Sequence, residues 1–91
     1  MKPYRIEIFP TARKELESLP KAAQVRIGRK IDSLAENPKL PGAKLLKRKD
    51  RDVYRVRVGD YRVLYQIHQE ILFVLVIRIG HRKDVYRGMS D

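Results

Sequence analysis

The feature that most constrains the fold is a set of three strand-like segments in the second half of the chain. Residues 53–58 carry apolar side chains at alternate positions, and residues 61–68 do so again after the link Gly59–Asp60. A two-residue link of this kind suits a tight β-hairpin. Residues 71–79 are apolar on both sides as far as Arg78, which is typical of a central strand. These segments predict three consecutive antiparallel strands.

The first half of the chain predicts one strand and two helices. Residues 4–9 alternate with period two, which indicates a strand. Two apolar stripes at helical spacing follow, formed by Ala12, Leu16 and Leu19 and then by Ala23, Ile27, Ile31 and Leu34. We therefore expect a single α+β domain over residues 1–91, in the order β-α-α-β-β-β. A helical hairpin would pack on a mostly antiparallel four-stranded sheet, with residues 40–52 as an exposed connection.

Charge is the strongest compositional signal. The 91 residues include 21 lysines and arginines against 11 acidic residues, which gives a net charge of +10. Such a protein is attracted to phosphate backbones, although a solubilising surface is the simpler alternative. The chain has no cysteine, which excludes disulfides and thiolate metal sites and fits a reducing cytoplasm. Its longest apolar run, residues 71–77, is far too short to span a bilayer. We expect a cytoplasmic protein with no membrane partner.

Three arginines are predicted to share one face of the hairpin. Arg55 and Arg57 are two residues apart on one strand, and Arg62 lies on the next. Residues two apart on a strand point to the same side, and cross-strand neighbours lie about 5 Å apart. Guanidinium groups match phosphate oxygens in a bidentate way, so a phosphodiester is the ligand that this group favours. The alternative is a solvated sheet face on which arginine stems cover apolar surface.

Two motifs identify a family resemblance that extends over essentially the whole chain. Residues 54–65 read YRVRVGDYRVLY and residues 79–86 read IGHRKDVY. Their sequences and their separation resemble those of the RelE toxins of type II toxin–antitoxin systems, within the wider RelE/ParE superfamily. The resemblance implies a ribosome-dependent endoribonuclease that cuts mRNA in the ribosomal A site. It also implies a RelB-like antitoxin as partner, and neither a metal ion nor any other cofactor.

The resemblance also implies a mechanism and its residues. In the family the 2′-hydroxyl beside the scissile phosphate attacks, leaving a 2′,3′-cyclic phosphate. Arg55 and Arg57 stand where the family places basic residues near the nucleophile, and Arg62 matches the arginine that stabilises the phosphate. Arg82 matches a general acid or charge stabiliser, and Tyr86 matches a tyrosine that orients or stacks on a base. Stacking of this kind contributes about 1–3 kcal/mol per base.

One departure from the family leaves the general base unidentified. Several members have lysines where this chain has Arg55 and Arg57, and arginine stays protonated under nearly all conditions. We therefore assign both arginines to electrostatic stabilisation. His81 is the one imidazole near the motif; it could supply acid–base chemistry and is a candidate for RNA binding, although a surface histidine is the simpler interpretation. Lys47 and Arg48, in the charged run before the hairpin, are further candidates for RNA binding.

Two other functions stay open at this point. A ParE-like toxin would inhibit DNA gyrase without cutting RNA, and Arg82 with Tyr86 argues against that branch. A non-catalytic basic module would bind RNA in a salt-dependent manner and leave it intact. Codon preference and the antitoxin interface are not encoded in any motif of this chain.

Overall fold

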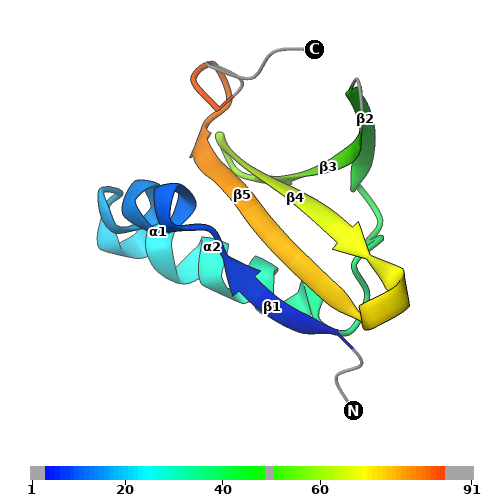
Figure 1. Cartoon of the computed structure of the whole chain (residues 1–91). Helices are drawn as coiled ribbons and strands as arrows, with labels where there is room; N and C mark the ends of the chain where they lie inside the picture. Colours follow the sequence, from blue (N-terminus) through cyan, green and yellow to red (C-terminus); the bar gives the residue numbers. More distant parts are fainter. Residues whose placement is uncertain (1–3, 49–50, 86–91) are drawn as a thin grey trace.

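Five strands and two α-helices make up the fold in the computed structural model, which describes residues 4–48 and 51–85 (Figure 1). In chain order the elements are β1 (Arg5–Ile8), α1 (Pro10–Glu17), α2 (Lys21–Leu34), β2 (Lys44–Arg48), β3 (Arg51–Val58), β4 (Tyr61–His68), the short 3₁₀ helix η1 (Gln69–Ile71) and β5 (Phe73–His81).

The five strands form one sheet in the order β1-β5-β4-β3-β2. β1 pairs with β5 in parallel, and the other neighbours are antiparallel. The predicted α+β class is confirmed, and β5 is an interior strand as predicted, paired with β1 and β4. β5 begins two residues later than its apolar run, because η1 occupies the preceding residues. Leu72 then reverses the chain in the left-handed region, with φ 51°.

The predicted number of four strands is wrong, because the segment expected to be an exposed connection contains β2. Lys44–Arg48 pairs antiparallel with β3, and this pairing places Leu46 opposite Val53 and Lys44 opposite Arg55. The segment was predicted to be a connection because it is rich in charge, but its backbone groups form hydrogen bonds with β3. The Leu46 side chain also packs against the cluster that contains Val53.

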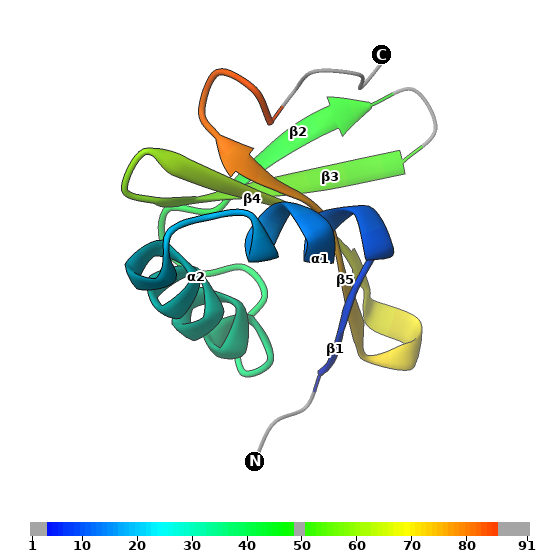
Figure 2. The same cartoon turned by 90° about the vertical axis from the view of Figure 1, so that its left-hand side faces the viewer.

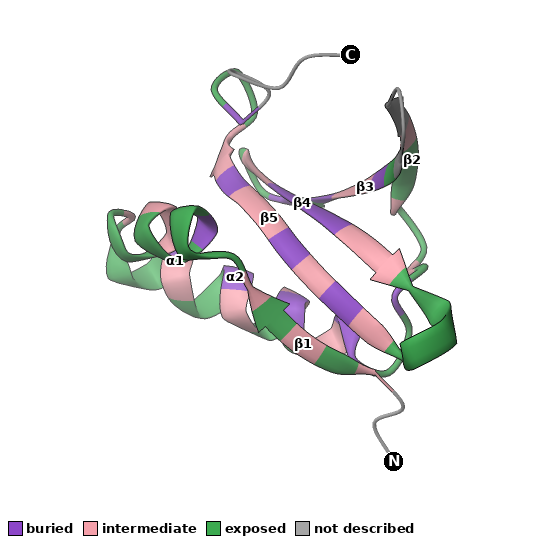
Figure 3. Cartoon of the chain, in the orientation of Figure 1, coloured by how far each residue is buried: buried purple, intermediate pink, exposed green. Residues whose placement is uncertain are grey.

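Both helices cover one face of the sheet, as Figures 1 and 2 show from two directions. Pro10 opens α1, where its fixed φ and missing N–H are tolerated. The apolar stripes of the two helices meet strand side chains in the main core, whose buried members are Ala12, Ile27, Ile31, Leu34, Val56, Val58, Val63, Tyr65, Val74, Val76 and Ile79 (Figure 3). The predicted apolar side of the helical hairpin is therefore confirmed. Neither described helix is long and apolar enough to cross a membrane.

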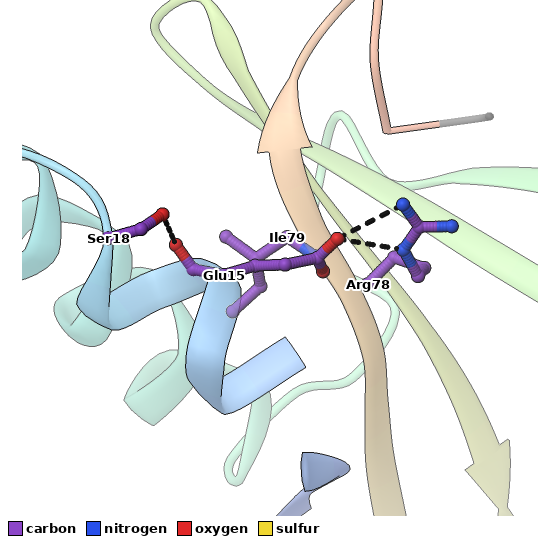
Figure 4. Close-up of polar contacts among 4 residues, drawn as sticks. All are labelled: Glu15, Ser18, Arg78 and Ile79. Carbon is purple, nitrogen blue, oxygen red and sulfur yellow. Dashed lines mark hydrogen bonds and ion pairs between the residues drawn. The ribbon is translucent and has the colours of Figure 1, made fainter. Parts of the chain in front are cut away.

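A carboxylate from α1 replaces a neighbouring strand where β1 ends beside β5. The backbone N–H of Ile79 donates to Glu15 Oε1 at 2.9 Å, and Arg78 Nε donates to Glu15 Oε2 at 3.0 Å (Figure 4). A second nitrogen of Arg78 lies 3.0 Å from the same oxygen, which makes a close ion pair. Glu15 thus satisfies an edge group of β5 and fixes α1 against the sheet.

Candidate nucleic-acid interface

The face of the sheet turned away from the helices carries a second, smaller apolar cluster. Its buried members are Val53, Leu64 and Val85, with Leu46 and Ile77 packed beside them. β2 and the segment after β5 stand on either side of this face (Figure 1). We call it the open face, because neither helix covers it.

The three hairpin arginines share this open face. Arg57 is directly opposite Arg62, and Arg55 is directly opposite Leu64, a member of the open-face cluster. Because side chains of paired residues point to the same side, Arg57 and Arg62 form a like-charge cross-strand pair. Two guanidinium groups on one side of the sheet can bind the oxygens of one phosphate, so the predicted arrangement of cations suits a phosphate.

Arg55 and Arg62 differ in how the surrounding protein holds them. Nη1 of Arg62 donates to the carbonyl oxygens of Gly59 (3.1 Å) and Tyr61 (3.0 Å), which orient the guanidinium at the hairpin turn. Arg55 Nε is buried and has no hydrogen-bond partner among the described residues. A buried donor left without an acceptor costs about 1–3 kcal/mol, so Arg55 is held at a cost in stability that Arg62 avoids.

The segment that follows β5 folds back over the open face and brings Arg82 to the hairpin. Val85 is buried against Val53 and Leu64, and its Cα lies 3.7 Å from where a Cβ on Gly80 would be. The backbone N–H of Arg82 donates to the Asp60 carbonyl oxygen at 2.8 Å. Arg82 therefore lies beside the turn that joins the strands of Arg57 and Arg62.

His81 does not join the arginines. It pairs with Tyr61 across the strands, and the two rings meet edge to face with centroids 6.3 Å apart. Tyr61 packs against the helix-side core, so the His81 ring lies on the opposite side of the sheet from Arg62. The alternation within β5 places Gly80, and not His81, beside Arg62.

Two other predicted residues are placed only in part, and a third is not described. Lys47 and Arg48 belong to β2, where their backbones pair with Asp52 and Arg51. The structure does not describe the side chains of Lys47 and Arg48. Tyr86 lies outside the described residues. Its proposed role in orienting a base therefore stays a prediction.

Lys44 is a member of the cationic group that motif reasoning missed. Its side chain is exposed, and its pairing with Arg55 places it on the open face next to that arginine. No local pattern identifies it, because its position depends on the unforeseen pairing of β2 with β3. The cationic group on the open face therefore comprises Lys44, Arg55, Arg57 and Arg62, with Arg82 at its end.

The chemistry available to this group is that of fixed positive charge. Guanidinium groups donate hydrogen bonds and stay charged, so they can bind phosphate oxygens and stabilise added negative charge. Within residues 4–48 and 51–85, no three histidine, cysteine or acidic residues gather as a metal site would require. Tyr65 lies in the helix-side core and not in this group. Burial there, and then neighbouring Tyr54, raise the pKa of Tyr65 to about 12.

Comparison with known proteins gives one consistent family. Residues 6–86 match the model of the ParE toxin of type II toxin–antitoxin systems. The chain is 36% identical over 88 residues to the toxin RelG of Mycobacterium tuberculosis, covering 93% of this chain and 98% of that protein. It is 28% identical over 80 residues to the mRNA interferase toxin RelE of Escherichia coli K12, covering 88% and 84%. The crystal structure of the RelE–RelB complex of Pyrococcus horikoshii superposes with a TM-score of 0.77 at 29% identity, covering 97% of this chain and 99% of that one.

Proposed function

Because the chain belongs to the RelE/ParE family of type II toxin–antitoxin toxins, we propose that it is an mRNA interferase, an endoribonuclease that arrests translation. We propose further that an antitoxin neutralises it, as the solved complex of a related toxin with RelB suggests. The observation that carries the proposal is the direct opposition of Arg57 and Arg62 on a face that no helix covers. Two guanidinium groups that face the same way can each bind oxygens of one phosphodiester.

The proposed reaction takes place on an mRNA that a ribosome is translating. In it, the ribose 2′-hydroxyl attacks the neighbouring phosphorus. The 2′ oxygen forms a bond to phosphorus, its proton passes to a base, and the bond to the 5′ oxygen breaks as that oxygen takes a proton. The products are a 2′,3′-cyclic phosphate and a 5′-hydroxyl. This route uses a nucleophile supplied by the substrate, and it proceeds without a metal ion.

Each arginine has a separate part in this proposal. Arg57 and Arg62 bind the non-bridging oxygens and stabilise the charge that develops on them in the transition state. Arg55, opposite Leu64 on the same face, contributes positive charge toward the RNA backbone. Arg82 acts at the leaving oxygen, and Tyr86 orients the base. None of the four guanidinium groups is a suitable base, so the proton acceptor is a different group.

Cleavage mapping tests the proposal. Induced expression followed by sequencing of mRNA 5′ ends should show new cuts that require translation. Arg57→Ala and Arg62→Ala should each lower the cleavage rate by about 10²–10³-fold, as expected for loss of a transition-state donor. Arg13→Ala is the matched control, since it removes the same charge from the exposed surface of α1.

Two outcomes would contradict the proposal. Full cleavage by Arg57→Ala and Arg62→Ala would show that the open face is not the reaction site. Intact mRNA together with trapped gyrase–DNA breaks would show that the chain follows the ParE branch, which is the branch that the family model names.

A further inference from the structure

A fifth arginine reaches the β3–β4 turn from the helix layer. Arg26 is exposed on α2, yet its side chain lies against Gly59. A Cβ at Gly59 would lie 2.9 Å from Arg26 Nη2 and 3.5 Å from Arg26 Cζ. Gly59 also has φ +60°, a conformation that suits glycine in a two-residue turn. The missing side chain is therefore what lets the guanidinium approach the turn.

This contact places Arg26 at the end of the sheet where the other cations gather. Nη1 of Arg62 donates to the carbonyl oxygen of the same Gly59, so that residue has one arginine beside its Cα and another at its oxygen. Asp60, the other turn residue, accepts the backbone N–H of Arg82. Cationic residues from α2, β4 and the segment after β5 thus lie round one turn, with Arg57 next to it on β3.

Arg26 has no hydrogen bond or ion pair within residues 4–48 and 51–85, so none of its donors is used by that part of the protein. A long charged side chain that only needed solvent could extend away from the sheet, whereas this one lies against the turn residue that Arg62 also contacts. Two guanidinium groups thus meet at one turn, where oxygens of a polyanion can bind both.

We propose that Arg26 extends the RNA-binding surface from the open face, round the β3–β4 turn and onto α2. On this proposal its guanidinium binds a backbone phosphate that flanks the one to be cut, and it positions the RNA without taking part in bond breaking. The inference rests on the proposed function for its ligand. RNA is favoured over an acidic protein because the surface is continuous with the arginines that face the scissile phosphate.

Salt-dependent binding provides the test. Full-length wild type, Arg26→Ala, Arg26→Lys and Arg29→Ala would be titrated onto a fluorescent single-stranded RNA whose 2′-hydroxyls are all methylated, so that it cannot be cut. Each phosphate contact on a single strand contributes about 0.7 to the slope of log K against log salt concentration. Arg26→Ala should therefore lower that slope by about 0.7 and weaken binding about fivefold at low salt, with its melting temperature unchanged.

The two other variants serve as controls. Arg29→Ala removes the same charge from the exposed surface of the same helix and should keep the wild-type slope. Arg26→Lys keeps the charge but loses the planar fork, and it should retain most of the slope with weaker binding.

The outcomes separate this inference from the proposed function. An unchanged slope for Arg26→Ala, or a wild-type chain that does not bind the RNA, would overturn the inference even if cleavage is observed. Weaker binding of the cognate antitoxin with RNA binding unaffected would assign Arg26 to the antitoxin interface and would also overturn it. A lowered salt slope for Arg26→Ala, together with a wild-type protein that does not cleave mRNA, would support Arg26 as an RNA contact. It would at the same time contradict the nuclease proposal.

Discussion

The two faces of the sheet use the same strands for opposite purposes. On the helix side, alternate residues of β3, β4 and β5 enter a core of aliphatic side chains and Tyr65. On the open face, the positions between them carry a small cluster around Val53 and Leu64 and, next to it, the opposed pair Arg57–Arg62. One face gains stability from burial, whereas the other holds charges that repel one another. A sequence that alternates with period two can thus place stabilising residues on one side of a sheet and binding residues on the other.

The largest expected effect is on the helix side. Ile27 is fully buried in the main core, so Ile27→Ala should lower the free energy of unfolding by about 3–4 kcal/mol. Val25→Ala on the same helix is the matched control, because Val25 is 46% exposed and should cost less than about 0.5 kcal/mol. Urea unfolding measures both. An equal loss of unfolding free energy in Arg57→Ala would show that the open face is also needed for folding. That result would contradict the difference between the two faces.

A second effect on the helix side depends on pH. Burial raises the pKa of Tyr65 from 10.0 to about 12, and its hydroxyl donates to the Pro38 carbonyl oxygen at 2.6 Å. The folded chain therefore keeps a proton that the unfolded chain releases. The stabilisation is complete below pH 10 and is lost as the pH rises through about 12, by roughly 2–3 kcal/mol in total.

Paired unfolding curves at pH 9 and pH 11.5 test this dependence. Tyr65→Phe should lose less stability between the two pH values than wild type does, although it is less stable at pH 9 because it lacks the hydrogen bond. Tyr61→Phe, which removes a partly exposed phenol, should keep the wild-type difference. Equal differences for all three proteins would show that Tyr65 does not govern alkaline unfolding.

The smallest predicted loss of stability is that of two buried valines on opposite faces of the sheet. Val85 and Val74 are both buried, but Val85 anchors the Arg82 segment on the open face and Val74 lies in the main core. Each valine-to-alanine change should lower the free energy of unfolding by about 1–2 kcal/mol. Only Val85→Ala should also lower the cleavage rate at a temperature where both variants are folded. Equal cleavage by the two variants would mean that the position of Arg82 does not depend on Val85.

Local patterns were sufficient for much of this fold but not for its long-range pairing. The clean alternation of residues 61–68 predicted β4 with its observed bounds, and the helical stripes identified the buried side of both helices. β2 was missed because its residues, KLLKR, do not alternate and its partner is needed to define it. The parallel pairing of β1 with β5 likewise joins distant parts of the chain.

The candidate site was predictable to the same extent. The shared face of Arg55, Arg57 and Arg62 follows from period two within one hairpin. Lys44 and Arg26 could not be found in this way, because one reaches the group through strand pairing and the other through packing of α2 on a turn. His81 was grouped with the arginines by its neighbours in sequence, although the pairing of β5 places its ring on the helix side.

The place of β5 between β1 and β4 has a consequence for the order of folding. β1 is made long before β5, yet β5 is its partner, with Arg5 opposite Phe73. Contacts between such distant residues form slowly, because a long loop must close before any of them stabilises the fold. The main core therefore cannot assemble until β5 has been synthesised. A protein proposed to interrupt translation would acquire that ability only after β5 has left the ribosome.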